Sequence, residues 1–339
     1  MVRGDLNKKK LKQEIIIKGV EEDINKMSKY VFGVDIGGTT VKLGFFTTEG
    51  ELLDKWEITT RKDEGGKNIL PDVAASITAK IEEKGISKDE VVGAGIGVPG
   101  PVRDDGTVLR CVNLGWGVFN VETEFESITG LPCKVGNDAN MASLGEMWQG
   151  GGKGFSSIVM VTLGTGVGGG IIINGKMLYG TNGAGGEIGH ICVNDAETDV
   201  CGCGKRGCLE QYTSATGITR MAERALTNTD RPSKLRNVQY ISAKEIFDAA
   251  KEGDDLALEL VENHGKTLGK ALATVACVCD PEAFVIGGGV SRAGDILIET
   301  TQKYYQQYVF HACKNTKFVL ATLGNDAGIY GCAEAILTK

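Results

Sequence analysis

Short apolar runs separated by glycine-rich turns recur along this chain. Runs of strand length lie at 30–35, 91–98, 157–163 and 284–286. Between them, residues 68–84 show the spacing of a surface helix that ends before Gly85, and residues 211–226 that of a second helix. Residues from about 255 form a long helix that ends before Pro281. Strands that alternate with helices predict an α/β protein with mixed sheets covered by helices.

One pattern, a strand followed by a glycine turn and a second strand, occurs twice. Its copies are 30–46 and 157–173, and gap-free superposition sets Gly164 beneath Gly37. In the second copy the glycine turn is expected over 164–170, and Asn174-Gly175 after it predicts a type I′ turn. The tip of such a hairpin can present bare backbone N–H groups to phosphate oxygens, although either copy alone fits a tight turn without a ligand. A P-loop is excluded, because no helix follows and the G-K-[ST] ending is missing. The matching register predicts two similar domains that face one another, each with one phosphate loop.

Composition narrows the possible partners. Glycine accounts for 49 of the 339 residues, an excess that suits tight turns and close approach of the backbone to ligands. A net charge of −7 disfavours non-specific binding to nucleic acid, and no apolar run approaches the ~20 residues of a membrane helix. Ten cysteines without an export signal predict a cytoplasmic protein with reduced thiols. We expect neither nucleic acid nor a membrane as a partner.

Residues 183–210 contain a possible metal site. His190, Cys201, Cys203 and Cys208 form a Cys₃His set, which would fill a zinc tetrahedron and leave no position for a reacting water. The set therefore predicts a structural Zn²⁺ that would also hold Glu187 and Glu210 in place. Because the C-x-C-x₄-C spacing differs from the familiar paired C-x-x-C, a glycine-rich loop with ordinary reduced cysteines is the alternative.

Two further stretches combine polar side chains with a change from strand to helix. Asn137 and Asp138 lie between a strand and a helix that runs to about Gln149, and one of them is the natural N-cap. An aspartate at a helix N-terminus stays ionised and can accept a proton from a bound hydroxyl. The glycines at 287–289 can lie against an adenine or a ribose, with Ser291 capping the next helix; a turn without a ligand fits equally well.

Three motifs together resemble a known family. E-x-G-H at 187–190, followed by C-G-C-G-x-x-G-C-L-E at 201–210, resembles the signature of the ROK family (repressors, open reading frames and sugar kinases). D-I-G-G-T-T at 35–40 resembles the first phosphate loop of the actin-like, hexokinase and Hsp70 superfamily. The resemblance spans 30–337 and implies a two-domain actin-like/hexokinase-type (ribonuclease H-like) fold with a central cleft and a zinc-bound loop. It also implies an activity most like that of a bacterial ATP-dependent glucokinase, which converts D-glucose to glucose 6-phosphate.

The same resemblance implies roles for individual residues. Asp138 would be the catalytic base, and His190 would bind both zinc and sugar. ATP with Mg²⁺ would lie in the cleft, with Asp35 near the Mg²⁺ through water. The implied sugar contacts are Asn113, Asn137, Asp138, Glu187, His190 and Glu210. The implied nucleotide contacts are Asp35, Gly37, Gly38, Thr39, Lys42, Gly164, Thr165, Gly166, Gly288 and Gly289. Family analogy further implies a homodimer or homotetramer.

The expected organisation is an N-terminal extension (1–27), a small α/β domain (28–139, completed by a C-terminal helix at 326–339) and a large α/β domain with the zinc loop (140–325). Leu11, Ile15 and Ile16 allow a short apolar stripe in the extension. One alternative is a ROK kinase for another sugar: N-acetylmannosamine, fructose, mannose or allose. A second is a sugar-sensing regulator of the same family, for which the 26 residues before Met27 are too few to form a winged helix-turn-helix. A zinc module without catalysis would leave the paired loops and Asp138 unexplained.

Overall fold

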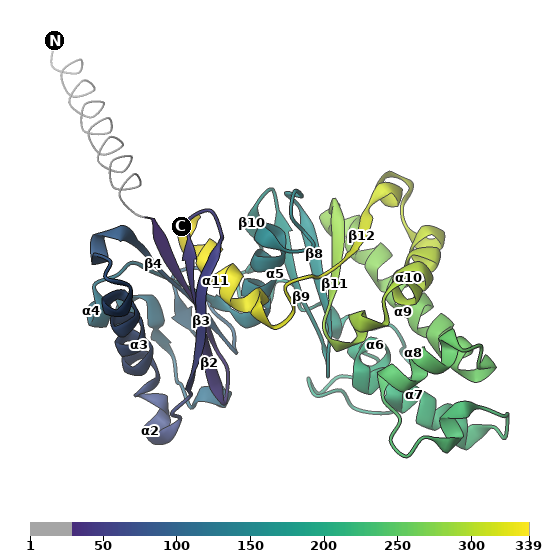
Figure 1. Ribbon diagram of the computed structural model, residues 1–339. Coiled ribbons are helices and arrows are strands. Elements are labelled where there is room, and N and C mark those ends of the chain that lie inside the picture. Colours follow the sequence, from purple (N-terminus) through teal and green to yellow (C-terminus); the bar gives the residue numbers. More distant parts are fainter. Residues whose placement is uncertain (1–28, 339) are drawn as a thin grey trace, which may run out of the picture. The chain divides into compact units, whose positions relative to one another are not determined.

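The computed structural model describes residues 29–338 (Figure 1). The expected extension at 1–27, with its apolar stripe, lies outside these residues. The chain forms two compact units, and each is described by itself. Unit 2 is Asn137–Gly331, and unit 1 contains the residues before it together with those from Cys332 onward. The second boundary falls inside α11 (Ala327–Leu337). The expected division into folding domains stays a prediction.

Unit 1 is built on a five-stranded sheet in the order β3-β2-β1-β4-β7. β1 and β2 are antiparallel, as are β2 and β3, whereas β1 and β4 are parallel. Side chains from α3 and α4, such as Ile77 and Phe125, complete its buried core. The elements are β1 (Tyr30–Ile36), β2 (Thr40–Thr47), β3 (Leu52–Thr59), α2 (Asp63–Gly66), α3 (Ile69–Lys84), β4 (Val91–Val98), β5 (Thr107–Val108), β6 (Phe119–Asn120), α4 (Val121–Thr129) and β7 (Cys133–Asn137).

Unit 2 repeats this plan in a sheet of order β10-β9-β8-β11-β12. β8 and β9 are antiparallel, and β8, β11 and β12 are parallel to one another. The Asn174-Gly175 turn joins β9 to β10 with positive φ at both residues, as the sequence predicted for a type I′ turn. The strands are β8 (Ile158–Leu163), β9 (Val167–Ile173), β10 (Lys176–Met177), β11 (Ala283–Gly287) and β12 (Lys317–Leu320). Both units are mixed sheets packed with helices, so the predicted α/β class is confirmed.

The helices of unit 2 share a large apolar core with its sheet. The rings of Phe284, Tyr305 and Phe318 lie with centroids 5.0–5.7 Å apart and join β11, α10 and β12. Figure 1 shows α9 and α10 side by side, in green and yellow-green. α9 ends as predicted before Pro281, with Asp280 in the left-handed region. The helices are α5 (Asp138–Gln149), α6 (Glu210–Thr213), α7 (Ala215–Asn228), α8 (Ala243–Lys251), α9 (Asp255–Cys279) and α10 (Asp295–Tyr308).

Three details differ from the sequence-based expectations. The glycines at 168–170 belong to β9 and not to a loop. The helix expected from Gln211 to Leu226 is broken at Ser214, whose side chain accepts from Gly217 N and caps α7. Ser291 does not cap α10: its hydroxyl donates to Gly288 O (2.7 Å), and Gly294 precedes the helix. Among residues 29–338, no helix is long and apolar enough to cross a membrane.

Close packing of β4 against α11 generates a stability prediction. A Cβ at Gly95 would overlap the carbonyl oxygen of Cys332, and the Cys332 thiol donates to Val34 O of β1 (3.1 Å). Gly95→Ala should therefore lower the free energy of unfolding by about 1–3 kcal/mol, the usual cost of overpacking. Gly117→Ala is the matched control, because Gly117 is exposed and has no heavy atom within 4 Å of the added carbon. Equal denaturation midpoints for the two variants would contradict this packing.

Candidate functional site

Asp138 is the first residue of α5, directly after β7. The helix is capped by its neighbour: Asn137 Oδ1 accepts from Ala139 N (3.0 Å) and Asn140 N (3.3 Å). Asp138 Oδ1 also accepts from Ala139 N (2.8 Å). Because Asn137 supplies the cap, the half-buried carboxylate of Asp138 is not needed for that purpose.

The environment of Asp138 changes its acidity. Burial raises the pKa of its carboxyl group above the ordinary value, and the negative charge of Glu187 raises it further. Hydrogen bonds from Ala139 N–H and from the Asn137 side chain oppose the shift. A partly desolvated carboxylate with a raised pKa is a stronger base than an exposed aspartate, and this is the usual environment of a general base.

The three glycines of β9 hold the segments around this carboxylate. A side chain at Gly170 would overlap Ser143 of α5, and Gly168 lies beside Ala139 of the same helix. On the opposite face, a Cβ at Gly169 would lie 2.6 Å from Gly186 O and 2.8 Å from the Ile188 side chain. Because β9 has no side chains at these positions, α5, which carries Asp138, packs against one face of the strand, and the segment that carries Glu187 packs against the other.

The four predicted metal donors come together in unit 2. One donor atom from each of His190, Cys201, Cys203 and Cys208 lies within 4.8 Å of the others. Cys203 Sγ and Cys208 Sγ are 3.6 Å apart, and Cys201 Sγ is 3.8 Å from His190 Nδ1. Tetrahedral zinc, with Zn–S of about 2.3 Å and Zn–N of about 2.0 Å, sets its donors roughly 3.5–3.8 Å apart. The spacing therefore fits zinc.

The chemistry of the donors also fits a cation. Burial raises the pKa of the Cys201 thiol to about 12 and raises that of Cys208 as well, so thiolates there need a compensating positive charge. Zn²⁺ would supply that charge. Nδ1 is the imidazole nitrogen that faces the cysteine sulfur, and Nε2 lies 3.9 Å from Glu187 Oε2. Metal at Nδ1 would leave Nε2 on the side of Glu187.

Glu210 joins the metal cluster to the second predicted phosphate loop. Its Oε1 accepts from the Cys201 thiol (2.8 Å) and lies 3.7 Å from His190 Nδ1. Its Oε2 lies 2.6 Å from the position of a Cβ at Gly166, so a side chain there would require Glu210 to move. The loop is anchored to the start of α7, where Ala215 N donates to Gly164 O (2.8 Å) and the Thr216 hydroxyl donates to Thr165 O.

Unit 1 holds the first predicted phosphate loop and the Asn113 loop. Thr60 fixes the hairpin tip, because its hydroxyl donates to Gly37 O (2.8 Å) and its N–H donates to Thr39 O (2.9 Å). Asp35 and Lys42 are direct partners across β1 and β2 and therefore share one face of the sheet. The exposed Asn113 stands on a short 3-10 helix (Val112–Leu114), and its carbonyl oxygen lies 4.0 Å from the Cβ position of Gly38.

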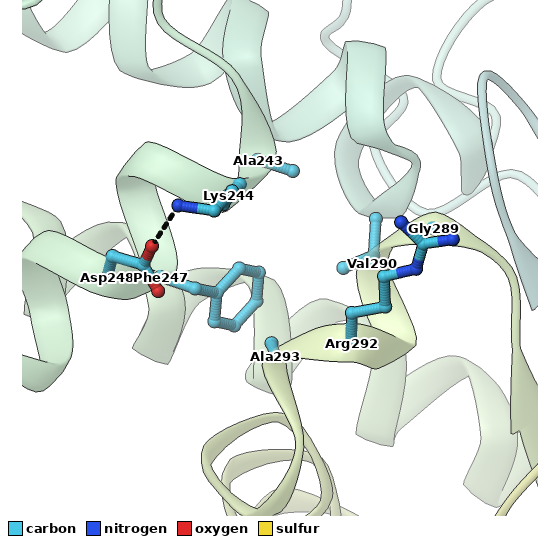
Figure 2. Close-up of a pocket in the computed structure, with 8 residues that line it drawn as sticks. All are labelled: Ala243, Lys244, Phe247, Asp248, Gly289, Val290, Arg292 and Ala293. Atoms are coloured by element: carbon cyan, nitrogen blue, oxygen red, sulfur yellow. Dashed lines mark hydrogen bonds and ion pairs between the residues drawn. The ribbon is translucent and has the colours of Figure 1, made fainter.

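A cavity of about 270 Å³ opens between α8 and the turn after β11 (Figure 2). Lys244, Phe247 and Asp248 line one wall, where Lys244 Nζ pairs with Asp248 Oδ2 (2.7 Å), and Gly289 and Arg292 line the other. Gly289 borders open space, whereas Gly288 packs against the backbone of Leu163 with φ 83°. The sequence predicted Gly288 and Gly289 as nucleotide contacts. It did not predict that α8 forms a wall of the cavity, because no motif marks that helix as part of a site.

The chain is similar to known proteins over most of its length. The model of a family described as the ROK family matches residues 31–339. The chain is 44% identical to a glucokinase of Halalkalibacterium halodurans, over 89% of this chain and 93% of that protein. It is 36% identical to a glucokinase of Thermotoga maritima, over 90% and 96% of the two chains. A solved ROK family glucokinase from Streptomyces griseus, in complex with glucose and AMPPNP, aligns with a TM-score of 0.68 and 33% identity, covering 90% of this chain and 98% of that one.

The metal cluster can be tested directly. The purified protein should contain about one zinc per chain, and Cys203→Ser should lose most of it, because a hydroxyl is a poor replacement for a thiolate. Elemental analysis measures the content, and limited proteolysis should show faster cleavage between residues 191 and 209. Cys277→Ser is the control, since Cys277 is an exposed thiol outside the cluster. Full zinc content in Cys203→Ser would exclude it as a ligand.

Proposed function

Because this chain belongs to the ROK family, we propose that it is an ATP-dependent glucokinase that forms glucose 6-phosphate from D-glucose. The two glucokinase relatives and the glucokinase structure support the reaction and the substrate. The observation that carries the mechanism is the half-buried carboxylate of Asp138, which lies beside a helix cap that Asn137 already provides. A general base needs such a carboxylate, held in place and poorly solvated.

The proposed sugar contacts are polar groups of known orientation. Glu187 and Glu210 flank the His190 ring within 3.9 Å and offer carboxylate oxygens to sugar hydroxyls. A metal-bound imidazole is fixed in tautomer and orientation, so His190 acts as a directed hydrogen-bonding group. Asn137 of unit 2 and Asn113 of unit 1 complete the proposed set. Zinc remains outside the chemical step, because four protein ligands leave no open position.

The proposed nucleotide contacts come from both repeated hairpins. Gly37, Gly38 and Thr39 in unit 1, and Gly164, Thr165 and Gly166 in unit 2, would offer N–H groups to phosphate oxygens. Asp35 would hold Mg²⁺ through water, with Lys42 opposite it on the sheet. Gly288 and Gly289 would receive the adenosine, and this part of the proposal is supported by the cavity of Figure 2, which Gly289 lines.

The proposed step is a direct displacement. Asp138 accepts the proton of the 6-hydroxyl as that oxygen attacks the γ-phosphorus; the bond from phosphorus to the bridging oxygen breaks, and ADP leaves. Mg²⁺, when bound, neutralises charge on the phosphates. We further propose that the reaction takes place in the cytoplasm, since a reducing compartment keeps the zinc-binding thiols available and none of the ten cysteines, all within residues 29–338, forms a disulfide. The homodimer or homotetramer expected from the resemblance stays a prediction.

Asp138→Asn tests the base. Turnover, measured as ADP release with a panel of hexoses and N-acetylhexosamines, should be highest on glucose and should fall about 10²–10⁴-fold in the variant, the usual contribution of a general base. The melting temperature should stay equal or rise: because burial raises the pKa, the ionised carboxylate costs stability at neutral pH, and the amide removes that cost.

Asp255→Asn is the matched control for this substitution. Asp255 is also the first residue of a helix and also follows a capping residue, Asp254, but it is exposed on α9. It should retain full turnover. Normal activity in Asp138→Asn would exclude the base assignment, whereas turnover confined to an N-acetylhexosamine would keep the base and change the substrate.

The acid limb of the pH profile tests the electrostatics. A base must be deprotonated, so kcat/KM should fall with a slope of one as the pH drops through the pKa of Asp138, at higher pH than for an ordinary aspartate. Glu187→Gln removes a negative charge that raises this pKa, so the limb should move to lower pH. A limb that stays in place or moves to higher pH in Glu187→Gln would contradict the coupling between the two carboxylates.

A further inference from the structure

A buried carboxylate lies inside the metal loop (residues 191–209) without contacting the metal donors. Glu197 is 6% exposed, and its Oε1 accepts from the N–H groups of Thr198 (2.9 Å) and Asp199 (3.0 Å). Its Oε2 accepts from the Tyr212 hydroxyl (2.6 Å). The loop is therefore folded around this carboxylate, and α6 already contributes one of its partners.

Two arginines of α7 neutralise Glu197. Arg224 donates to both of its oxygens, Nη1 to Oε2 (3.2 Å) and Nη2 to Oε1 (3.1 Å), and Arg220 Nη2 donates to Oε2 (3.1 Å). Both guanidinium groups also donate to Asp199 Oδ2. The arginine side chains are four residues apart and so share one face of the helix. The Arg224 guanidinium holds the pKa of Glu197 well below the ordinary range, so this ion pair persists at any working pH.

Gln211 connects the ion pair to the metal donors. Its Oε1 accepts from Cys208 N (3.0 Å), and its Nε2 donates to Asp199 O (3.0 Å). Arg220 Nη2 also donates to the carbonyl of Gln211 (2.7 Å). The Gln211 side chain thus joins Asp199 and Cys208, the two ends of the stretch that contains all three cysteine ligands. Arg220 in turn holds the backbone of Gln211.

We infer that Glu197, Arg220, Arg224 and Gln211 form a positioning clamp that sets the geometry of the metal donors and of Glu210. Among the described residues, no hydrogen bond joins these four side chains to the four donor atoms. Gln211 nevertheless holds the backbone at Asp199, two residues before Cys201, and at Cys208. Glu210, which precedes Gln211, shares this constraint. The part of the inference that concerns sugar affinity depends on the proposed function, whereas the part that concerns the metal does not.

Glu197→Gln tests the clamp in the zinc-loaded protein. The amide keeps the shape but removes the charge that pairs with both arginines. Zinc release into a chromophoric chelator should be about 10–100-fold faster, the usual penalty for losing support behind metal ligands. The KM for glucose should rise while the KM for ATP stays unchanged, a split that a general loss of stability would not produce.

Glu262→Gln is the matched control. Glu262 also accepts from a cation and a tyrosine, Lys303 Nζ (2.9 Å) and Tyr304 hydroxyl (2.7 Å), but it lies on α9 away from the metal loop. Its zinc release should match that of the parent protein. If Glu197→Gln fails to fold, Tyr212→Phe removes only one hydrogen bond from the same carboxylate and should accelerate zinc release to a smaller extent.

The outcomes separate the clamp from the proposed function. Unchanged zinc release in folded Glu197→Gln, or in Tyr212→Phe where that variant is needed, overturns the clamp even if the protein phosphorylates glucose. Faster release from a protein that phosphorylates no sugar supports the clamp and overturns the proposed function. Faster release with an unchanged KM for glucose limits the clamp to the metal and overturns its role in placing Glu210.

Discussion

Close contact of the β9 backbone with its neighbouring segments is the constraint on which the candidate site of unit 2 depends. A side chain at Gly170 would push away α5 on one face, and a side chain at Gly169 would push away the 186–188 segment on the other. Hydrophobic burial alone would not place these segments so accurately, because larger side chains interdigitate in several ways, whereas backbone contact allows little variation in distance. Asp138 and Glu187 are near enough for the charge of one to raise the pKa of the other because both lie against this strand.

Charge compensation then divides the metal loop into two regions. The thiols of Cys201 and Cys208 lie where burial raises their pKa and disfavours their ionised forms, so they need a metal to become thiolates. Glu197 lies equally deep but carries its own compensation in Arg220 and Arg224. Two clusters thus hold a loop with little regular structure. In the Glu197 cluster the positive charge comes from arginine side chains, and in the cluster of metal donors it would come from a metal ion. Removing one partner from either cluster leaves an uncompensated buried group, and this is the costly kind of defect.

The sequence predicted features that depend on local rules. The conformational preferences of single residues explain the type I′ turn at Asn174-Gly175 and the end of α9 before Pro281. They also predicted a cap for α5 from either Asn137 or Asp138, and the structure places it on Asn137. The sequence did not predict the features that depend on tertiary packing. No local pattern shows that Gly169 faces Ile188 rather than a phosphate, or that Ser214 interrupts a helical stretch to cap α7. The clamp and the α8 wall of the cavity escaped prediction because their residues are far apart in sequence and resemble ordinary surface charges.

The pair Asn137-Asp138 shows why a helix start suits a general base. A capping side chain is consumed by backbone N–H groups, which lower the pKa of a carboxylate and make it a weaker base. Here the amide oxygen of Asn137 accepts from both backbone donors of the cap, and the Asp138 carboxylate shares only one of them, Ala139 N. Burial and Glu187 can then raise the pKa of Asp138 more than its remaining hydrogen bonds lower it. Exchanging the two residues would keep a capping side chain, but the carboxylate would then accept the backbone N–H groups of the cap. These hydrogen bonds would lower its pKa and make it a weaker base.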